Sequence, residues 1–316
     1  MAGGGNRGAA PVAAPAWRTL APPAAAAAAG VVLAWAVSGA VGGTWAGLAR
    51  ALADGAGATV LGLAALPRLT DRHEVAWRPL TVAAGVWFAA ELVVLAGDAA
   101  DIVGVPVTDL APSDFGTFLI HLSGGQIGLA ILAATAAIAC YSALSFRRPA
   151  TASPDLVLIF AAVALALRPV TGHMSQQALG SVLAAVHALA AACWFGLLIA
   201  MALVLRTRGD WAAALPRYSG LAAPLIVLLA ASGLINGLIR ADGPAGLLRT
   251  GYGHILLAKL AVLLVLAGLG WWWRRHWVPR TRDHRGTAED SLRNAVVELT
   301  VMGVAFGLAA ALAVTA

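Results

Sequence analysis

Long apolar runs alternate with short polar connections along almost the whole chain. An α-helix needs about 20 apolar residues to cross the hydrocarbon core of a bilayer. The strands of a membrane barrel would instead alternate apolar and polar residues and give a much weaker hydropathy signal. The pattern therefore predicts an all-α, polytopic bundle of about nine transmembrane helices, near 24–48, 52–67, 80–97, 117–145, 155–170, 178–205, 219–239, 254–273 and 293–315.

The composition supports a membrane protein. The 316 residues are 60% hydrophobic and only 11% charged, whereas a soluble domain is about a quarter charged. The formal net charge is +6. Because anionic lipids and topology explain a basic membrane protein, we expect a lipid bilayer as its surroundings and no nucleic-acid partner.

Basic residues gather on alternate connections between the predicted spans. The third connection is acidic, and the second, fourth, sixth and eighth carry most of the arginines. By the positive-inside rule, the N-terminus is predicted to be cytoplasmic and the C-terminus extracytoplasmic, in a multi-pass protein of the cytoplasmic membrane. The basic connections hold Arg68, Arg72, Arg78, Arg147, Arg148, Arg206, Arg208, Arg217, Arg274, Arg275, Arg280, Arg282 and Arg285.

Three regions follow from this pattern. Residues 1–23 are rich in Gly, Pro and Ala and are predicted to be a disordered cytoplasmic tail. The first apolar segment could also be a cleaved signal peptide, since small residues stand near Ser38. Residues 24–164 form an N-terminal transmembrane region of about five helices, with the span near 155–170, and residues 165–316 form a C-terminal one.

Four of the seven histidines fall near the predicted outer face, and a methionine stands beside one of them. Neutral imidazole and thioether sulfur together suit copper, as Cu(I) or Cu(II). We therefore predict an outward-facing copper entry site. An interfacial position is an alternative for two of these residues, His121 and His254. The candidate ligands are His187, His173, Met174, His121 and His254.

The strongest of these candidates is His187, because an unpaired imidazole inside a span is costly. Trp194 and Met201 follow it at intervals of seven residues and fall close to the same helix face. Charged residues inside spans are functional candidates by default. The uncharged Asn236 is also a candidate, but it could equally join two helices by a hydrogen bond. The possible pathway residues are Trp194, Met201, Asn236, Lys259, Glu298, Met302 and Glu91.

Several short pieces of the chain, from Thr171-Gly-His173 to Glu298, resemble the CopD copper-resistance family over roughly residues 165–316. The resemblance rests on several short pieces. It implies a membrane protein that moves copper from the extracytoplasmic side toward the cytoplasm, often with a CopC-type copper carrier as partner. The pieces are Thr171-Gly-His173, His187-Ala-Leu-Ala-Ala-Ala-Cys-Trp-Phe-Gly196, Leu215-Pro-Arg-Tyr-Ser219, Ser232-Gly-Leu-Ile-Asn236, Tyr252-Gly253, Leu257-Ala-Lys-Leu260, Val278-Pro279 and Glu298.

The sequence thus favours a copper transporter with a role in copper homeostasis or resistance, and not an enzyme. A P-loop signature is absent, so the chain is not predicted to be a self-powered ATPase. Two alternatives stay open. One is a haem-binding membrane redox protein with His187 as an axial ligand. The other is a copper-binding sensor or assembly factor that does not transport.

Overall fold

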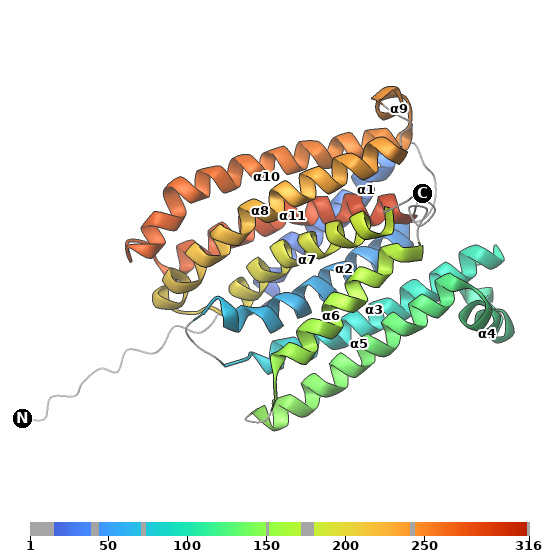
Figure 1. Ribbon diagram of the computed structural model, residues 1–316, viewed down its shortest axis with the longest axis horizontal. Helices are drawn as coiled ribbons and strands as arrows, with labels where there is room; N and C mark the ends of the chain where they lie inside the picture. The colour runs from blue at the N-terminus through green and yellow to red at the C-terminus, as the bar shows by residue number, and fades with distance from the viewer. Residues whose placement is uncertain are drawn as a thin grey trace, which may run out of the picture.

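Parallel and antiparallel α-helices form one bundle in the computed structural model, which describes residues 16–38, 44–70, 74–149, 152–171, 180–240 and 244–314 (Figure 1). No strand occurs among these residues, which confirms the all-α prediction. Eight helices of the described part are long and apolar enough to cross a membrane. They are α1 (Ala16–Ser38), α2 (Thr44–Ala65), α3 (Trp77–Val103), α5 (Ser123–Arg147), α7 (Gly180–Val204), α8 (Arg208–Arg240), α10 (Gly251–Arg282) and α11 (Ala288–Val314).

Shorter elements complete the described part of the chain. The helix α6 (Pro154–Leu167) corresponds to the predicted span 155–170, but it has only 14 residues. A 3-10 turn, η4 (Arg168–Thr171), continues it. The other short elements are η1 (Leu66–Arg68), η2 (Val107–Asp109), α4 (Pro112–His121) and α9 (Pro244–Arg249).

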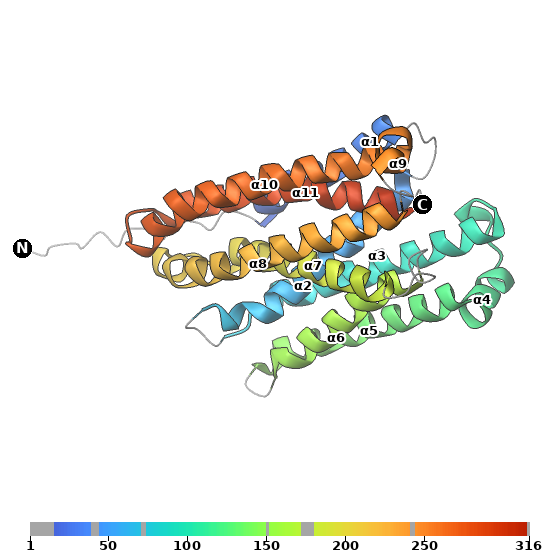
Figure 2. The same cartoon turned by 45° about the horizontal axis from the view of Figure 1, so that its top comes forward.

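The long helices run side by side in roughly the same direction, and α4 and α9 lie at the same end of the bundle (Figures 1 and 2). We call this the outer end, after the predicted topology, and the opposite end, where most arginines lie, the inner end. Large apolar side chains are exposed around the bundle, including Val227 at 67% and Leu264 at 65%. Such an apolar surface is what lipid contact requires.

Three helix boundaries correct the sequence-based expectation. The first helix begins at Ala16, so residues 16–23 are helical and do not belong to a disordered tail. It ends at Ser38, and α2 begins at Thr44, whereas one span was predicted over 24–48. The predicted span 117–145 is also divided, because Leu122 has an extended backbone and separates α4 from α5. His121 therefore ends α4 and is not part of a span.

Close helix packing uses small residues in the way membrane helices do. A Cβ atom on Gly62 of α2 would collide with the backbone of Gly196 on α7, and a Cβ on Gly196 would collide with the carbonyl of Ala58. On α11, Gly303 and Gly307 face the backbone of α1 in the same manner. The helix α2 packs against α3, α6, α7 and α11, so it joins the N-terminal helices to the C-terminal ones.

Candidate functional site

A hydrogen bond between α7 and α8 orients His187. Its Nδ1 lies 2.9 Å from Ser232 Oγ, and that hydroxyl donates to the carbonyl of Leu228 at 2.6 Å. Because a serine hydroxyl has a single proton, Ser232 Oγ accepts from His187 Nδ1–H. The lone pair of the neutral ring is then on Nε2, and the carbonyl of Leu229 also lies within reach of the ring. A second partner that fixes the tautomer in this way is typical of metal-binding histidines.

Two further polar side chains, Asn236 on α8 and Lys259 on α10, form what we call the histidine cluster together with His187 and Ser232. Lys259 on α10 is within electrostatic range of His187. Asn236 lies one helical turn beyond Ser232, and its Oδ1 is buried without a hydrogen bond in the described part. A Cβ on Gly233 would lie 3.2 Å from His187 Cε1, so the glycine allows α8 to approach the ring.

Further toward the inner end lies the glutamate cluster, which consists of Trp194, Tyr218 and Glu298. Trp194 stands seven residues after His187, about 10 Å along α7. The three side chains are 3–4% exposed, and Tyr218 OH donates to Glu298 Oε1 at 3.3 Å. The indole nitrogen of Trp194 is near both partners but makes no hydrogen bond among the described residues. No charged side chain of the described part acts on Glu298.

The two methionines of the predicted pathway are both buried. Met201 on α7 is 0% exposed and Met302 on α11 is 2% exposed. Both belong to the hydrophobic cluster that also contains Trp194 and Tyr218. Thioether sulfur is therefore present inward of His187, although packing alone would also account for it.

A third polar group, the arginine cluster, joins α2 and α3 of the N-terminal region to η4. Arg168 of η4 pairs with Glu91 on α3, and its Nε lies 3.3 Å from Asp54 Oδ1 on α2. Trp87 Nε1 also donates to Glu91 Oε1 at 2.7 Å. These contacts account for the burial of Glu91, which the sequence analysis had assigned to the predicted pathway. Nearby, Arg50 and Asp98 form a longer pair of 3.9 Å.

The other predicted entry-site residues are not brought together in the described part of the chain. His121 is exposed on α4, which lies across the outer end from α9 and the start of α10 (Figures 1 and 2). His254, also exposed, faces carbonyls of Val37 and Leu248 with its two ring nitrogens at 3.1 Å. Neither nitrogen is open to a metal ion in that arrangement. His173 and Met174 lie outside the described residues.

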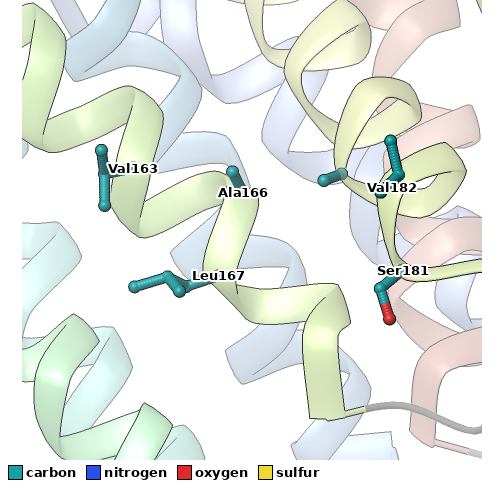
Figure 3. Close-up of a pocket in the computed structure, with 6 residues that line it drawn as sticks. Val163, Ala166, Leu167, Ser181 and Val182 are labelled. Carbon is teal, nitrogen blue, oxygen red and sulfur yellow. The ribbon is translucent and has the colours of Figure 1, made fainter. Parts of the chain in front are cut away.

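Metal ligands do not cluster elsewhere either, because the described residues contain no group of three or more His, Cys, Asp or Glu that could hold a metal ion. Two grooves of the surface are apolar. One of about 310 Å³ opens between α6 and α7, as Figure 3 shows, and a similar one lies between α10 and α11. Hydrocarbon chains fit such grooves and copper does not. The first is lined by Val163, Ala166, Leu167, Ser181, Val182 and Ala185.

The sequence predicted His187 and Glu298 as candidate residues but not their hydrogen-bond partners. Ser232 and Tyr218 lie in the pieces that resemble the CopD family, but no role was predicted for them or for Arg168. The available signal was the presence of polar side chains in otherwise apolar helices. This signal does not identify which helices are in contact. The sequence alone therefore could not predict which polar side chains pair.

The comparison with known families agrees with the C-terminal part of this picture. The family model CopD, described as copper resistance protein D, matches residues 212–312. This range holds most of α8, together with α9, α10 and most of α11, and it confirms the resemblance in that part of the chain. Tyr218, Ser232, Asn236, Lys259 and Glu298 lie within it. No curated protein and no solved structure matches the chain significantly.

Proposed function

We propose that this multi-pass membrane protein moves copper ions across the cytoplasmic membrane, from the extracytoplasmic side toward the cytoplasm, with His187 as its central ligand. The match of residues 212–312 to a copper resistance family supports the cargo. The observation that carries the proposal is the His187–Ser232 hydrogen bond. It leaves a metal-binding nitrogen on a half-buried ring of a membrane-spanning helix, where an imidazole without a task would be costly.

The arrangement of α7 suits stepwise conduction. An ion that leaves His187 next meets the level of Trp194 and then the buried thioether of Met201, with Met302 on the neighbouring α11. A permeation path needs several weak sites and no single tight one, since the ion must also leave. A lone histidine followed by buried methionines fulfils this condition better than a closed cage of three ligands.

The position of Lys259 supports Cu(I) as the oxidation state of the transported copper. Its ammonium acts electrostatically on the site of His187. Coulomb repulsion by one positive charge is twice as large for Cu(II) as for Cu(I) at the same distance. Imidazole and thioether ligands also accept Cu(I) readily. Cu(I) is therefore the transported ion in this proposal. A CopC-type carrier is a suitable donor at the outer end, and the chain transports without chemical conversion of its cargo.

Copper flux into proteoliposomes tests the proposal. Purified protein is reconstituted with a Cu(I)-specific chromogenic chelator inside the vesicles, and copper is supplied outside under reducing conditions. Flux should fall at least about tenfold in His187→Ala. His276→Ala is the matched control, because His276 is exposed at the inner end and stacks on Trp272 at 3.9 Å. Unchanged flux in His187→Ala would remove His187 from the path.

Metal content and visible absorbance of the same samples separate the alternatives. Bound copper that decreases in His187→Ala, without a Soret band, supports the transporter. A Soret band that disappears with His187 would indicate a haem redox protein instead. Copper binding without any flux would indicate a sensor or assembly factor. Both variants should elute and unfold as the wild type does, so that a folding defect is not mistaken for a lost site.

A further inference from the structure

Glu298 is an acidic side chain within an apolar helix that has no cationic partner in the described part. It is 4% exposed, and the groups that face it are Tyr218 on α8 and Trp194 on α7. The helices α1, α2 and α10 also pack against α11, but none of them presents a charged side chain that acts on Glu298. Burial, packing and hydrogen bonds thus define a site that contains one ionisable carboxyl and no compensating charge.

The surroundings of this carboxyl make both of its protonation states accessible. An isolated carboxylate in a dry, apolar bundle is strongly disfavoured. Hydrogen-bond donors that point at the carboxylate work in the opposite direction. Tyr218 OH already donates to Glu298, and the buried indole N–H of Trp194 is free to do so. A group balanced in this way can bind and release a proton without a large rearrangement.

Buried polar groups continue from Glu298 toward the inner end. Ser291 stands seven residues earlier on α11 and Trp211 seven residues before Tyr218 on α8, so both lie about 10 Å further inward. Trp277 links these two positions, because it donates to Ser291 Oγ at 3.2 Å and packs against Trp211. The side chains of Ser291 and Trp211 are at most 1% exposed.

Several donors of this layer have no partner among the described residues. They include Trp211 Nε1, Trp273 Nε1 and Thr281 Oγ1. Buried polar groups in native proteins are nearly always satisfied by protein or by ordered water. Water that served these groups would form a polar route between the basic inner end and the glutamate cluster.

We propose that Glu298 is a site of reversible proton binding that exchanges its proton with the inner end of the bundle along Ser291, Trp211 and Thr281. The proposal rests on the proposed function for its purpose. When Cu(I) enters the inner half, release of the proton to the inner solution leaves one carboxylate charge that offsets the ion. The carboxyl regains a proton when the ion has left. One proton is released and one is taken up on the same side, so no net proton crosses.

Infrared difference spectroscopy tests the proton site without copper. Wild-type protein in nanodiscs of phosphatidylcholine and phosphatidylglycerol is titrated with acid, and the C=O band of protonated carboxyls is recorded. Part of this band should be missing in Glu298→Gln and shifted in Tyr218→Phe, which lacks the phenol donor. Glu91→Gln is the matched control, because Glu91 is equally buried but paired with Arg168. Its spectrum should keep the component assigned to Glu298.

A spectrum of Glu298→Gln that is identical to that of the wild type would overturn the proposal. The flux assay adds a second measurement. Flux through the wild type should vary with the pH inside the vesicles, by up to about tenfold per pH unit for a single group, and flux through Glu298→Gln should not. Equal pH dependence in both proteins would also overturn it.

The two proposals can fail separately. His187→Ala should lose copper flux and keep the Glu298 band. If the wild type shows the Glu298 band but moves no copper, the proton site stands and the transport function fails. If copper flux depends on His187 while the band is unchanged in Glu298→Gln, transport stands and the proton site fails.

Discussion

Two buried glutamates, one in each half of the chain, have nearly the same surroundings except for one partner. Glu91 is 5% exposed and Glu298 is 4% exposed. Each accepts a hydrogen bond from an aromatic side chain, Trp87 in the first case and Tyr218 in the second. Glu91 also pairs with Arg168, whereas no charged side chain of the described part acts on Glu298.

The difference assigns different tasks to the two halves. A buried carboxylate with a cation beside it is compensated, so it holds helices in place and responds little to its surroundings. A carboxyl without a cation responds to protons and to passing ions. We therefore expect the arginine cluster to act as a structural tie between α2, α3 and η4, whereas the proposed proton site lies on the C-terminal helices. The family match also falls in the C-terminal half.

Removal of Arg168 should give the largest effect on stability, because it leaves the buried Glu91 and the half-buried Asp54 without their partner. Arg168→Met should lower the free energy of unfolding by about 3–5 kcal/mol. Denaturant or thermal unfolding in a mild detergent measures this loss. The control is Arg68→Met, since Arg68 and its partner Asp155 have side chains 50% and 61% exposed. An exposed pair contributes about 0–1 kcal/mol. Equal losses in both variants would show that the arginine cluster is no structural tie.

The second-largest expected effect is a loss of copper affinity when the histidine cluster in the C-terminal half is altered. Ser232→Ala removes the acceptor that fixes the His187 tautomer, so copper affinity should fall about 10–100-fold. The matched control is Ser142→Ala, because Ser142 donates to a carbonyl four residues earlier, as Ser232 does, but has no histidine beside it. Competition with a chelator of known affinity measures both variants. A comparable loss in the control would mean that the effect on copper is indirect.

Hydropathy predicted the helices well because a helix that spans a bilayer must be apolar along its length. It did not predict a helix end where the backbone breaks within an apolar stretch. One such break lies at Leu122, after His121, where the run of polar residues is too short to predict it. Individual polar residues were found by the same reasoning, which is why His187 and Glu298 were singled out correctly as residues inside spans.

Their pairing was not predictable from one sequence. Glu91 and Arg168 are 77 positions apart, and His187 and Ser232 are 45 apart. Whether such residues meet depends on which helices are neighbours and on their rotation. Close approaches of small residues, as at Gly62 and Gly196, determine that arrangement. Glycine is common throughout this chain, so its presence alone does not identify the contact.

The third prediction concerns the close contact between α2 and α7, which joins the two halves of the chain. Gly196→Ala places a methyl group against the carbonyl of Ala58, and overpacking of this kind should cost about 1–3 kcal/mol of stability. Gly268→Ala on α10 is the control, since a Cβ there meets nothing within 4 Å. It should stabilise the protein by about 0.4–1 kcal/mol. If Gly196→Ala behaved like Gly268→Ala, the two halves would not be joined through this contact.

The smallest effect on stability is expected for a substitution of Glu298, one of the two buried glutamates. Glu298→Gln keeps an oxygen acceptor for Tyr218 and leaves no cation behind, so stability at neutral pH should change by no more than about 1 kcal/mol. Glu91→Gln leaves Arg168 with Asp54 as its remaining carboxylate, and it should therefore lose clearly more. Unfolding of the two variants side by side, in the same lipid and buffer, measures the contrast. A large loss in Glu298→Gln alone would mean that Glu298 holds the fold together, and the division between a structural and a responsive glutamate would have to be reversed.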